Sequence, residues 1–277
     1  MSSWINGRPI TKVKAPIILK VKHNSGFFSC CSVQLGMIIE FYNKYKSVPQ
    51  VINTDEQFGW YRPGTTETYF TTQNTQLSLP KKYIDYEHFH QYTDYTKLDY
   101  AGLAPFVKKY FSPSEEIQGI IRDLEAKYLL DYDNICVLFY RGNDKVTETP
   151  VPTYEDYVKR AGALLEKEPN LRFLVQSDET EFIEAMESAF PGKTVVFRDE
   201  IRHISKSMTT VDKVFKDDNF KFSKFYVAIT IAMSKCKHIV FGSGNCSIWI
   251  ALFRGNSRNI QQFLKTGWIN AQTASQV

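Results

Sequence analysis

The hydrophobic residues in the second half of the chain fall into short apolar runs that alternate with segments of helical periodicity. Apolar runs typical of β-strands occupy residues 134–141, 171–178, 193–197 and 237–244. Segments with apolar residues at helical spacing occupy residues 153–168, 179–190, 222–236 and 245–255. Strands and helices that alternate at this spacing predict a doubly wound parallel sheet of the α/β class.

The first half of the chain opens with a similar pattern and then loses it. Residues 15–23 predict a strand, residues 24–31 a loop, residues 32–46 a helix and residues 48–54 a second strand. Residues 58–99 are rich in Tyr, Thr, Gln and Asn and show little periodicity, which predicts long loops or an insertion. This segment is either a surface elaboration or an aromatic, amide-rich wall suited to a sugar.

A further helix is predicted at residues 112–130, where Ser114 precedes two glutamates and an apolar helical face. Its start suggests a domain boundary. We expect an N-terminal domain at residues 1–112, a second domain at residues 113–265, and a tail at residues 266–277 that either packs against the first domain or frays.

Composition narrows the class of protein. The chain has 277 residues, of which 43% are hydrophobic, enough to bury one large core or two small ones. The net charge of +4 is too small for a dedicated nucleic-acid binder and suits a small anionic ligand. Five cysteines without metal-ligand spacing predict reduced thiols and no metal site. The sequence shows neither a signal peptide nor a membrane span, so a cytoplasmic location is expected.

Polar residues follow the predicted strand at residues 134–141, whose last residue is Arg141. In sheets of this kind, ligands bind beyond the carboxyl ends of the strands. Arg141 can grip a diphosphate through two hydrogen bonds, Lys145 adds a point charge, and Asp144 can hold either cation in place. A surface ion-pair cluster is the alternative.

Two more predicted strands end in polar residues. Asp178 can accept a hydrogen bond from a ribose or base edge, or can simply cap the helix that follows. Ser243, Gly244, Asn245 and Ser247 lie where the last strand gives way to a helix, as in a phosphate cradle, although an ordinary turn would look the same. Together the three strand ends predict a site for a nucleotide diphosphate.

Three quoted segments carry a family resemblance: "YRGNDKVTETPVPTYEDYV", "FLVQSDETEFIEAM" and "IAMSKCKHIVFGSGNCSIWIAL". Their order and spacing over residues 134–255 resemble the donor-binding domain of GT-B-type α1,6-fucosyltransferases. The resemblance implies two Rossmann-like domains, each with a doubly wound parallel sheet, that face a cleft. It also implies an inverting, metal-independent and cofactor-free transfer of a sugar from a nucleotide diphosphate to a glycan hydroxyl.

The resemblance also implies roles for individual residues. Arg141 and the turn at residues 243–245 would bind the donor diphosphate, and Asp144, Lys145 and Asp178 would line the donor site. For the base that deprotonates the acceptor, Glu148 is the first candidate and Asp144 its competitor. Weaker candidates in the first half are Asp55 and His23.

The chain departs from the family at two places. Val227–Ile229 replaces an aspartate that contacts the donor base, and Gly142 stands where a second arginine is frequent. The donor is therefore left open between GDP-fucose and another GDP- or UDP-sugar such as UDP-xylose. Because the chain also lacks the membrane anchor of the eukaryotic relatives, a microbial or viral enzyme is expected.

Two other functions compete with a transferase. A non-catalytic module that binds a sugar or a nucleotide, with a decayed transferase site, would explain both departures. A dinucleotide-dependent oxidoreductase is disfavoured, because "HNSGFFSCC" after the first strand is a poor substitute for the G-x-G-x-x-G motif.

Overall fold

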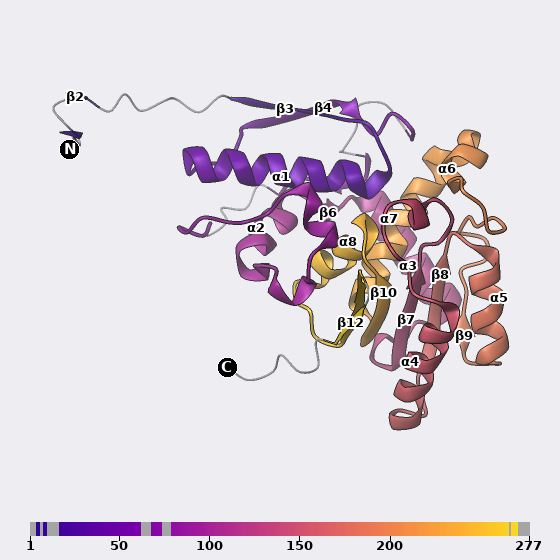
Figure 1. The fold of residues 1–277 in the computed structure, drawn as a ribbon. Helices are drawn as coiled ribbons and strands as arrows, with labels where there is room; N and C mark the ends of the chain where they lie inside the picture. Colours follow the sequence, from indigo (N-terminus) through magenta and orange to yellow (C-terminus); the bar gives the residue numbers. More distant parts are fainter. Residues whose placement is uncertain are drawn as a thin grey trace.

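The computed structural model describes residues 4–5, 8–9, 17–61, 68–73, 79–265 and 267–270. Its centre is a six-stranded sheet in the order β12-β11-β10-β7-β8-β9 (Figure 1). The strands are β7 (Ile135–Tyr140), β8 (Arg172–Ser177), β9 (Thr194–Val195), β10 (His238–Gly242), β11 (Ile260–Leu264) and β12 (Gly267–Asn270). All neighbours pair in parallel except β11 and β12. The strand order reverses between β7 and β10, which is where such sheets bind ligands.

The helices of the second half lie where the sequence predicts them. They are α3 (Glu115–Tyr128), α4 (Tyr154–Lys167), α5 (Thr180–Ala189), α7 (Asn219–Lys235) and α8 (Asn245–Arg254), with a short α6 (Val211–Val214) before α7. All six residues of β7 are buried, so both faces of the sheet are covered there, because successive side chains of a strand point to opposite faces. No helix in the described part of the chain is long and apolar enough to cross a membrane.

The first half builds a smaller layer than the resemblance implies. The strands β3 (Ile18–His23) and β4 (Val51–Gln57) pair in parallel with each other, and α1 (Phe27–Tyr45) connects them. No further strand joins this pair within the described residues, so a second doubly wound sheet is not formed there. The reason lies in the segment after β4, which turns away into short 3-10 helices and irregular chain instead of returning to the sheet edge.

The segment after β4 is largely irregular where it is described, as its composition predicts. It holds β5 (Phe70–Thr71), which pairs with β6 (Ser112–Pro113), and the 3-10 helices η2 (His88–Tyr92) and η3 (Tyr95–Lys97). Residues 62–67 and 74–78 lie outside the described residues. A helix that the sequence did not predict, α2 (Tyr100–Tyr110), follows and is capped by the Asp99 side chain.

The start of α1 corrects another prediction. The loop expected at residues 24–31 is wrong from Phe27 onward, because the helix already begins there. Phe27, Phe28, Cys30 and Cys31 are all buried, and the Phe27 N–H donates to the Tyr61 hydroxyl (2.9 Å). The apolar sequence "FFSCC" is therefore the packed first turn of the helix.

The end of the chain also differs from the predicted tail. Gly267–Asn270 forms β12, the antiparallel edge strand of the main sheet. Trp268 packs on Tyr157, and the Arg160 guanidinium lies 4.1 Å from the centre of the Trp268 ring. This segment thus belongs to the second half; residues 266 and 271–277 lie outside the described residues.

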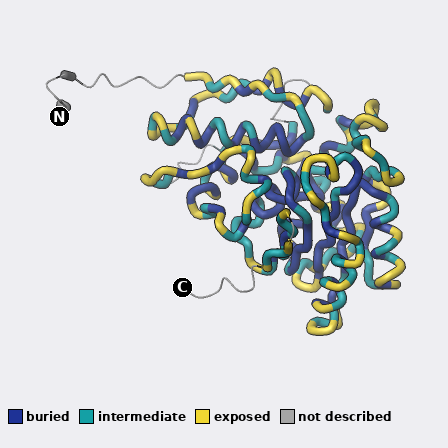
Figure 2. Tube along the Cα trace, in the orientation of Figure 1, coloured by how far each residue is buried: buried dark blue, intermediate teal, exposed yellow. Residues whose placement is uncertain are grey.

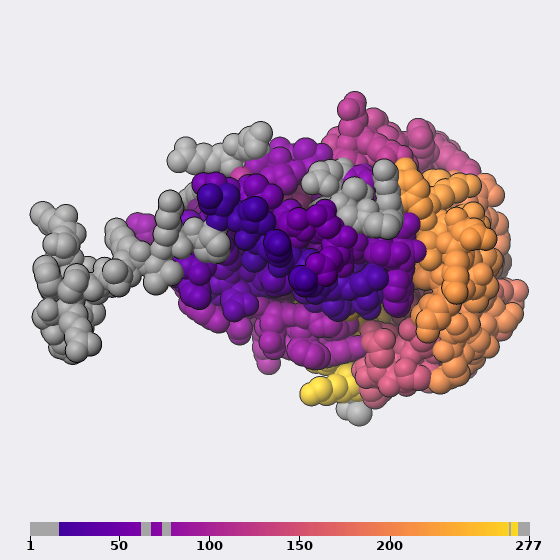
Figure 3. Space-filling model, turned by 90° about the horizontal axis from the view of Figure 1, so that it is seen from above, coloured from indigo at the N-terminus to yellow at the C-terminus, as the bar shows by residue number. Residues whose placement is uncertain are grey.

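The two halves share one contiguous hydrophobic core, dark blue in Figure 2. Trp249 of α8 is fully buried, packs on Phe28 and Phe111, and donates its Nε1–H to Ser32 Oγ (3.0 Å). From above, the indigo and purple first half lies directly against the orange segment of the second half (Figure 3). The domain boundary at residue 112 stays a prediction.

Candidate functional site

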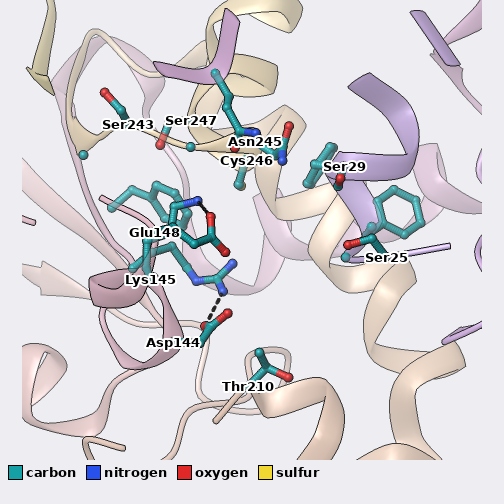
Figure 4. A pocket seen from close by; sticks show the side chains of 18 of the residues that line it. Ser25, Ser29, Asp144, Lys145, Glu148, Thr210, Ser243, Asn245, Cys246 and Ser247 are labelled. Carbon is teal, nitrogen blue, oxygen red and sulfur yellow. Dashed lines mark hydrogen bonds and ion pairs between the residues drawn. The ribbon is translucent and has the colours of Figure 1, made fainter. Parts of the chain in front are cut away.

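A pocket of about 370 Å³ lies at the carboxyl ends of β7 and β10, where the strand order reverses. Figure 4 shows its two sides. One side, here called the cationic wall, consists of Arg141, Asp144, Lys145, Glu148 and the turn at residues 243–247. The other, here called the α1 wall, consists of His23, Ser25, Ser29, Tyr61, His88 and Gln91.

Arg141 leaves the end of β7 and is held by two carboxylates. Its Nε donates to Asp178 Oδ2 (2.8 Å), and its Nη2 lies 3.4 Å from Asp144 Oδ1. Nη1 takes part in none of the hydrogen bonds among the described residues, so it is the group that remains for a ligand. The Arg141 side chain is 31% exposed, whereas that of Asp178 is 6% exposed. Asp178 therefore lies behind Arg141 and orients it.

Lys145 forms a tight group with Glu148 and Tyr92. Its Nζ donates to Glu148 Oε2 (2.5 Å) and to the Tyr92 hydroxyl (3.1 Å), and that hydroxyl donates to the same carboxylate oxygen (2.6 Å). Burial lowers the pKa of Lys145. Burial raises the pKa of Glu148, but the hydrogen bonds from Lys145 and Tyr92 outweigh it and leave that pKa lowered. Glu148 is thus an ionised carboxylate committed to Lys145.

Asp144 differs from Glu148 in its electrostatics. Burial raises the pKa of Asp144 more than the neighbouring Arg141 lowers it. Its side chain is 27% exposed, and its Oδ1 lies 3.4 Å from Nη2 of Arg141. Of the two carboxylates predicted as bases, Asp144 is therefore the more basic.

The turn after β10 lies against Lys145. A Cβ added at Gly244 would fall 2.9 Å from Lys145 Cε, so the glycine allows the lysine to lie against the backbone. The helix α8 begins directly at Asn245 without a side-chain cap, which leaves its first N–H groups for another partner. Ser243 is used internally, since its hydroxyl donates to Phe263 O (2.7 Å) and accepts from Gln262 Nε2 (2.9 Å).

The structure brings most of the predicted site residues into one pocket. Those that line it are Arg141, Asp144, Lys145, Glu148, Ser243, Gly244, Asn245 and Ser247. Asp178 reaches it only through Arg141. His23 lies on the α1 wall, whereas Asp55 is exposed on β4 and hydrogen-bonded to Asn53.

Solved structures resemble this chain in fold. A crystal structure of NodZ α-1,6-fucosyltransferase soaked with GDP-fucose superposes with a TM-score of 0.54 over 91% of this chain and 98% of NodZ, at 9% sequence identity. A structure of fucosyltransferase NodZ from Bradyrhizobium gives the same score and identity over 93% of this chain and 99% of that one. The chain has a fucosyltransferase-like glycosyltransferase fold. No family model matches the sequence, and no curated protein matches it.

The surroundings of Gly142 give the departure at this position a physical reason. A Cβ there would fall 2.0 Å from Glu179 Oε2, a fully buried carboxylate that accepts the Asn143 N–H (3.1 Å). A second arginine beside Arg141 is thus excluded by the residue beneath it. The departure at Val227–Ile229 also has a structural reason, because all three residues are fully buried in the core.

Apart from His23, sequence reasoning missed the polar cluster of the α1 wall. His23 Nε2 lies 2.9 Å from Ser29 Oγ, which lies 3.1 Å from His88 Nε2. The same nitrogen of His88 has Gln91 Nε2 at 3.4 Å and Asn245 Nδ2 at 3.5 Å. Burial lowers the pKa of both imidazoles, helped for His23 by His88 and for His88 by Lys145. For His88 the sequence signal was a pair of histidines, His88 and His90, in an irregular segment.

Within the residues that the structure describes, no group of three or more His, Cys, Asp or Glu side chains is placed to hold a metal ion. The lysine and arginine side chains that line the pocket are Arg141, Lys145 and Lys213.

Proposed function

We propose that the protein is a glycosyltransferase that moves a sugar from a nucleotide diphosphate to a hydroxyl of a glycan acceptor, with inversion and without a metal or other cofactor. One observation carries the proposal: Arg141 and Lys145 from the end of β7 converge with the turn at residues 243–247 in one pocket at the strand-order reversal. The NodZ-like fold supports it, because the NodZ structures include one soaked with GDP-fucose and one crystallised with GDP.

The donor diphosphate would lie across the cationic wall. Nη1 of Arg141, Nζ of Lys145 and the first N–H groups of α8 would donate to its oxygens, with the hydroxyl of Ser247 and the amide of Asn245 beside them. When the bond to the sugar breaks, negative charge grows on the departing diphosphate. Fixed cations in a half-buried pocket stabilise that charge more strongly than water does.

The remaining predicted residues take supporting roles. Asp178 would orient Arg141 from behind, and Asp144 would hold the other edge of the same guanidinium. The assignment of the base to Glu148 stays a prediction, with Asp144 as its competitor. The second half, from residue 113, would bind the donor, and the first half would face the acceptor.

GDP-fucose is the first donor to test, and UDP-xylose the second. One NodZ structure was soaked with GDP-fucose and another was co-crystallised with GDP, which favours a guanine donor. The buried apolar residues Val227–Ile229 offer no carboxylate to the edge of a guanine base. A UDP-sugar is therefore the alternative donor.

Calorimetric titration with GDP, UDP and their sugar forms tests the proposal. The wild type should bind at least one of these diphosphates, and Arg141→Ala should lose that binding while its circular dichroism spectrum stays that of the folded protein. The melting temperature of the variant should fall, because the buried Asp178 loses its cation. Arg198→Ala is a matched control, since Arg198 is an exposed arginine paired with Glu187 and does not line the pocket. A wild type that binds neither GDP nor UDP would refute the proposal.

A non-catalytic binding module is the second candidate, favoured by the excluded arginine at Gly142. It predicts the same binding without consumption of the donor. Release or transfer of the sugar from any bound donor would therefore dismiss the module and keep the transferase.

A further inference from the structure

We infer that the glycan acceptor is an oligosaccharide, and that its sugars beyond the reacting one bind in a second groove, which runs along α1 beside the pocket. The inference rests on the proposed transferase function and names the class of its acceptor. This groove, here called the Tyr83 groove, has a volume of about 690 Å³ and lies between α1 and the segment at residues 83–89. Tyr83 and Phe89 are its exposed aromatic side chains.

The α1 side of the Tyr83 groove continues one wall of the pocket. Ser29 lines the pocket, and the α1 residues that line the groove follow it at intervals of three or four, which places them on the same face of the helix. They are Val33, Gly36, Met37, Glu40, Asn43 and Lys44. From Ser29 to Lys44 this face is about 20 Å long at the rise of an α-helix, which is longer than one sugar ring. A chain of sugars that starts in the pocket can therefore follow α1.

The segment at residues 83–89 lies along the same face of α1 in the opposite direction. At the end near the pocket, His88 Nε2 is 3.1 Å from Ser29 Oγ. At the other end, the Asn43 amide donates to Ile84 O (2.7 Å) and accepts the Ile84 N–H (3.0 Å). His88 lines both the pocket and the groove, so a ligand in the groove would reach the pocket across His88.

The exposed aromatic rings of the molecule gather in this groove. Among the described residues, the large hydrophobic side chains that are exposed include three aromatic ones, those of Trp60, Tyr83 and Phe89. Tyr83 is 70% exposed and Phe89 is 66% exposed, and both line the groove. Single exposed apolar residues are ordinary, but two large rings in one groove indicate a ligand that covers them. The C–H face of a pyranose can stack on such a ring.

Both rings stand on backbone that is held in place. Ile84, next to Tyr83, is fully buried and is fixed by the Asn43 amide. Phe89 lies in η2, and its ring meets the His88 ring edge-on, with 5.4 Å between the two centres. Groups that are already ordered lose little conformational entropy when a ligand binds, so these rings are suited to recognition.

The polar groups of the groove fit a hydroxyl-rich chain better than a protein partner. Glu40, Lys44 and Glu87 line the groove and are exposed, so the apolar surface is interrupted and carries charges of both signs. An amphipathic helix would need a continuous apolar stripe, and an extended peptide would need a free strand edge, which neither wall supplies. Sugar hydroxyls can accept from the lysine and donate to the carboxylates while the ring faces stack on the aromatic side chains.

Gly36 leaves room between the two sides of the groove. It lies in the middle of α1, where glycine is a poor helix former. An added Cβ would come no closer to the opposite segment than 3.8 Å, at Glu87 Cα, which is an ordinary contact. Close packing therefore does not require a glycine at this position. A larger side chain would project from α1 into the groove.

The test is calorimetric titration of the full-length protein with oligomers of glucose, of mannose and of N-acetylglucosamine, from the monosaccharide to the hexasaccharide. In at least one series the affinity of the wild type should rise with chain length. Tyr83→Ala and Phe89→Ala should each lower the affinity for the longer oligomers about three- to tenfold, the worth of one stacked ring, and leave GDP affinity unchanged. Tyr83→Phe keeps the ring and should bind like the wild type.

Two further variants complete the design. Gly36→Leu narrows the groove without touching either ring, and it should also weaken the binding of the longer oligomers. Leu129→Ala is the matched control, because Leu129 is an exposed apolar residue that lines neither the pocket nor the groove, and it should change nothing.

The outcomes separate this inference from the proposed function. A wild type that binds GDP but no oligomer, or groove variants with the oligomer affinities of the wild type, would overturn the inference and leave the transferase intact. A dimer in sedimentation that Tyr83→Ala dissociates would assign the rings to a contact between two copies and would overturn it as well. A wild type that binds oligomers but neither GDP nor UDP would refute the transferase, and with it the role of the oligosaccharide as acceptor.

Discussion

Asp178 Oδ2 accepts the Nε–H of Arg141 at 2.8 Å, while its other oxygen accepts the Gly142 N–H at 3.2 Å. One buried carboxylate at the end of β8 thus fixes both the side chain and the backbone that follow β7. The ion pair joins neighbouring strands of a parallel sheet, so the direction of the guanidinium is set by the sheet itself. Nη2 of the guanidinium lies 3.4 Å from Asp144 Oδ1, so Nη1 is the nitrogen left to face the pocket.

Asp178→Asn should weaken nucleotide binding more than it weakens the fold. The amide keeps the shape and one hydrogen bond but loses the charge that holds Arg141, so GDP affinity should fall about tenfold, the equivalent of ~1.4 kcal/mol. Calorimetry measures the affinity and urea unfolding measures the stability. Unchanged affinity would mean that Arg141 does not depend on Asp178 for its orientation.

Gly142→Ala should destabilise the fold, because the new Cβ would lie 2.0 Å from Glu179 Oε2. Overpacking of this kind costs about 1–3 kcal/mol in the free energy of unfolding. Gly162→Ala is the matched control, since its Cβ would meet nothing within 4 Å in the middle of α4, and it should gain up to about 1 kcal/mol from helix propensity. The free energy of unfolding of both variants is measured by urea denaturation. A change of the same sign in Gly142→Ala and Gly162→Ala would contradict the close approach at Gly142.

Stability should fall as the pH drops below the ordinary imidazole value of about 6.5. The folded-state pKa values of His23 and His88 are lowered, so the unfolded chain binds protons that the folded chain refuses, and unfolding is favoured as pH falls toward those folded values. His23→Gln/His88→Gln should show a shallower loss of stability between pH 7 and 5 in urea titrations. His203 is a further histidine whose pKa is lowered, and both the wild type and the double variant retain it. Parallel pH curves for the two proteins would show that the cluster is not the source.

Trp249→Ala should destabilise the whole protein in one step. Trp249 is fully buried between Phe28 of α1 and Phe111, so its loss opens a cavity that joins the two halves. Removal of a buried tryptophan costs about 3–5 kcal/mol. Unfolding followed by fluorescence and by circular dichroism should remain one coincident transition at lower urea. Two separate transitions would show that the halves do not share a core.

Much of the second half could be predicted, because its signals are local. Buried parallel strands such as β7 are continuous apolar runs, and the helices between them carry apolar faces at helical spacing. The polar residues at the strand ends predicted a site that includes Arg141 and the turn at residues 243–247, because the carboxyl ends of parallel strands meet at one edge of the sheet.

The first half resisted prediction because its structure depends on contacts from distant segments. The first turn of α1, at Phe27, has no side-chain cap and receives support from the Tyr61 hydroxyl. Pro105 within α2 reads as a helix breaker, yet Asp99 caps this helix. His88 reaches the pocket only because the irregular segment folds back between α1 and α8, a placement with no periodic signal.

The structure of the protein in complex with GDP tests the central claim most directly. We predict that the diphosphate lies in the pocket between the two walls, with its oxygens within hydrogen-bond distance of Arg141 Nη1, Lys145 Nζ and the first N–H groups of α8. A diphosphate bound elsewhere on the molecule, with Arg141 still facing an empty pocket, would contradict the account.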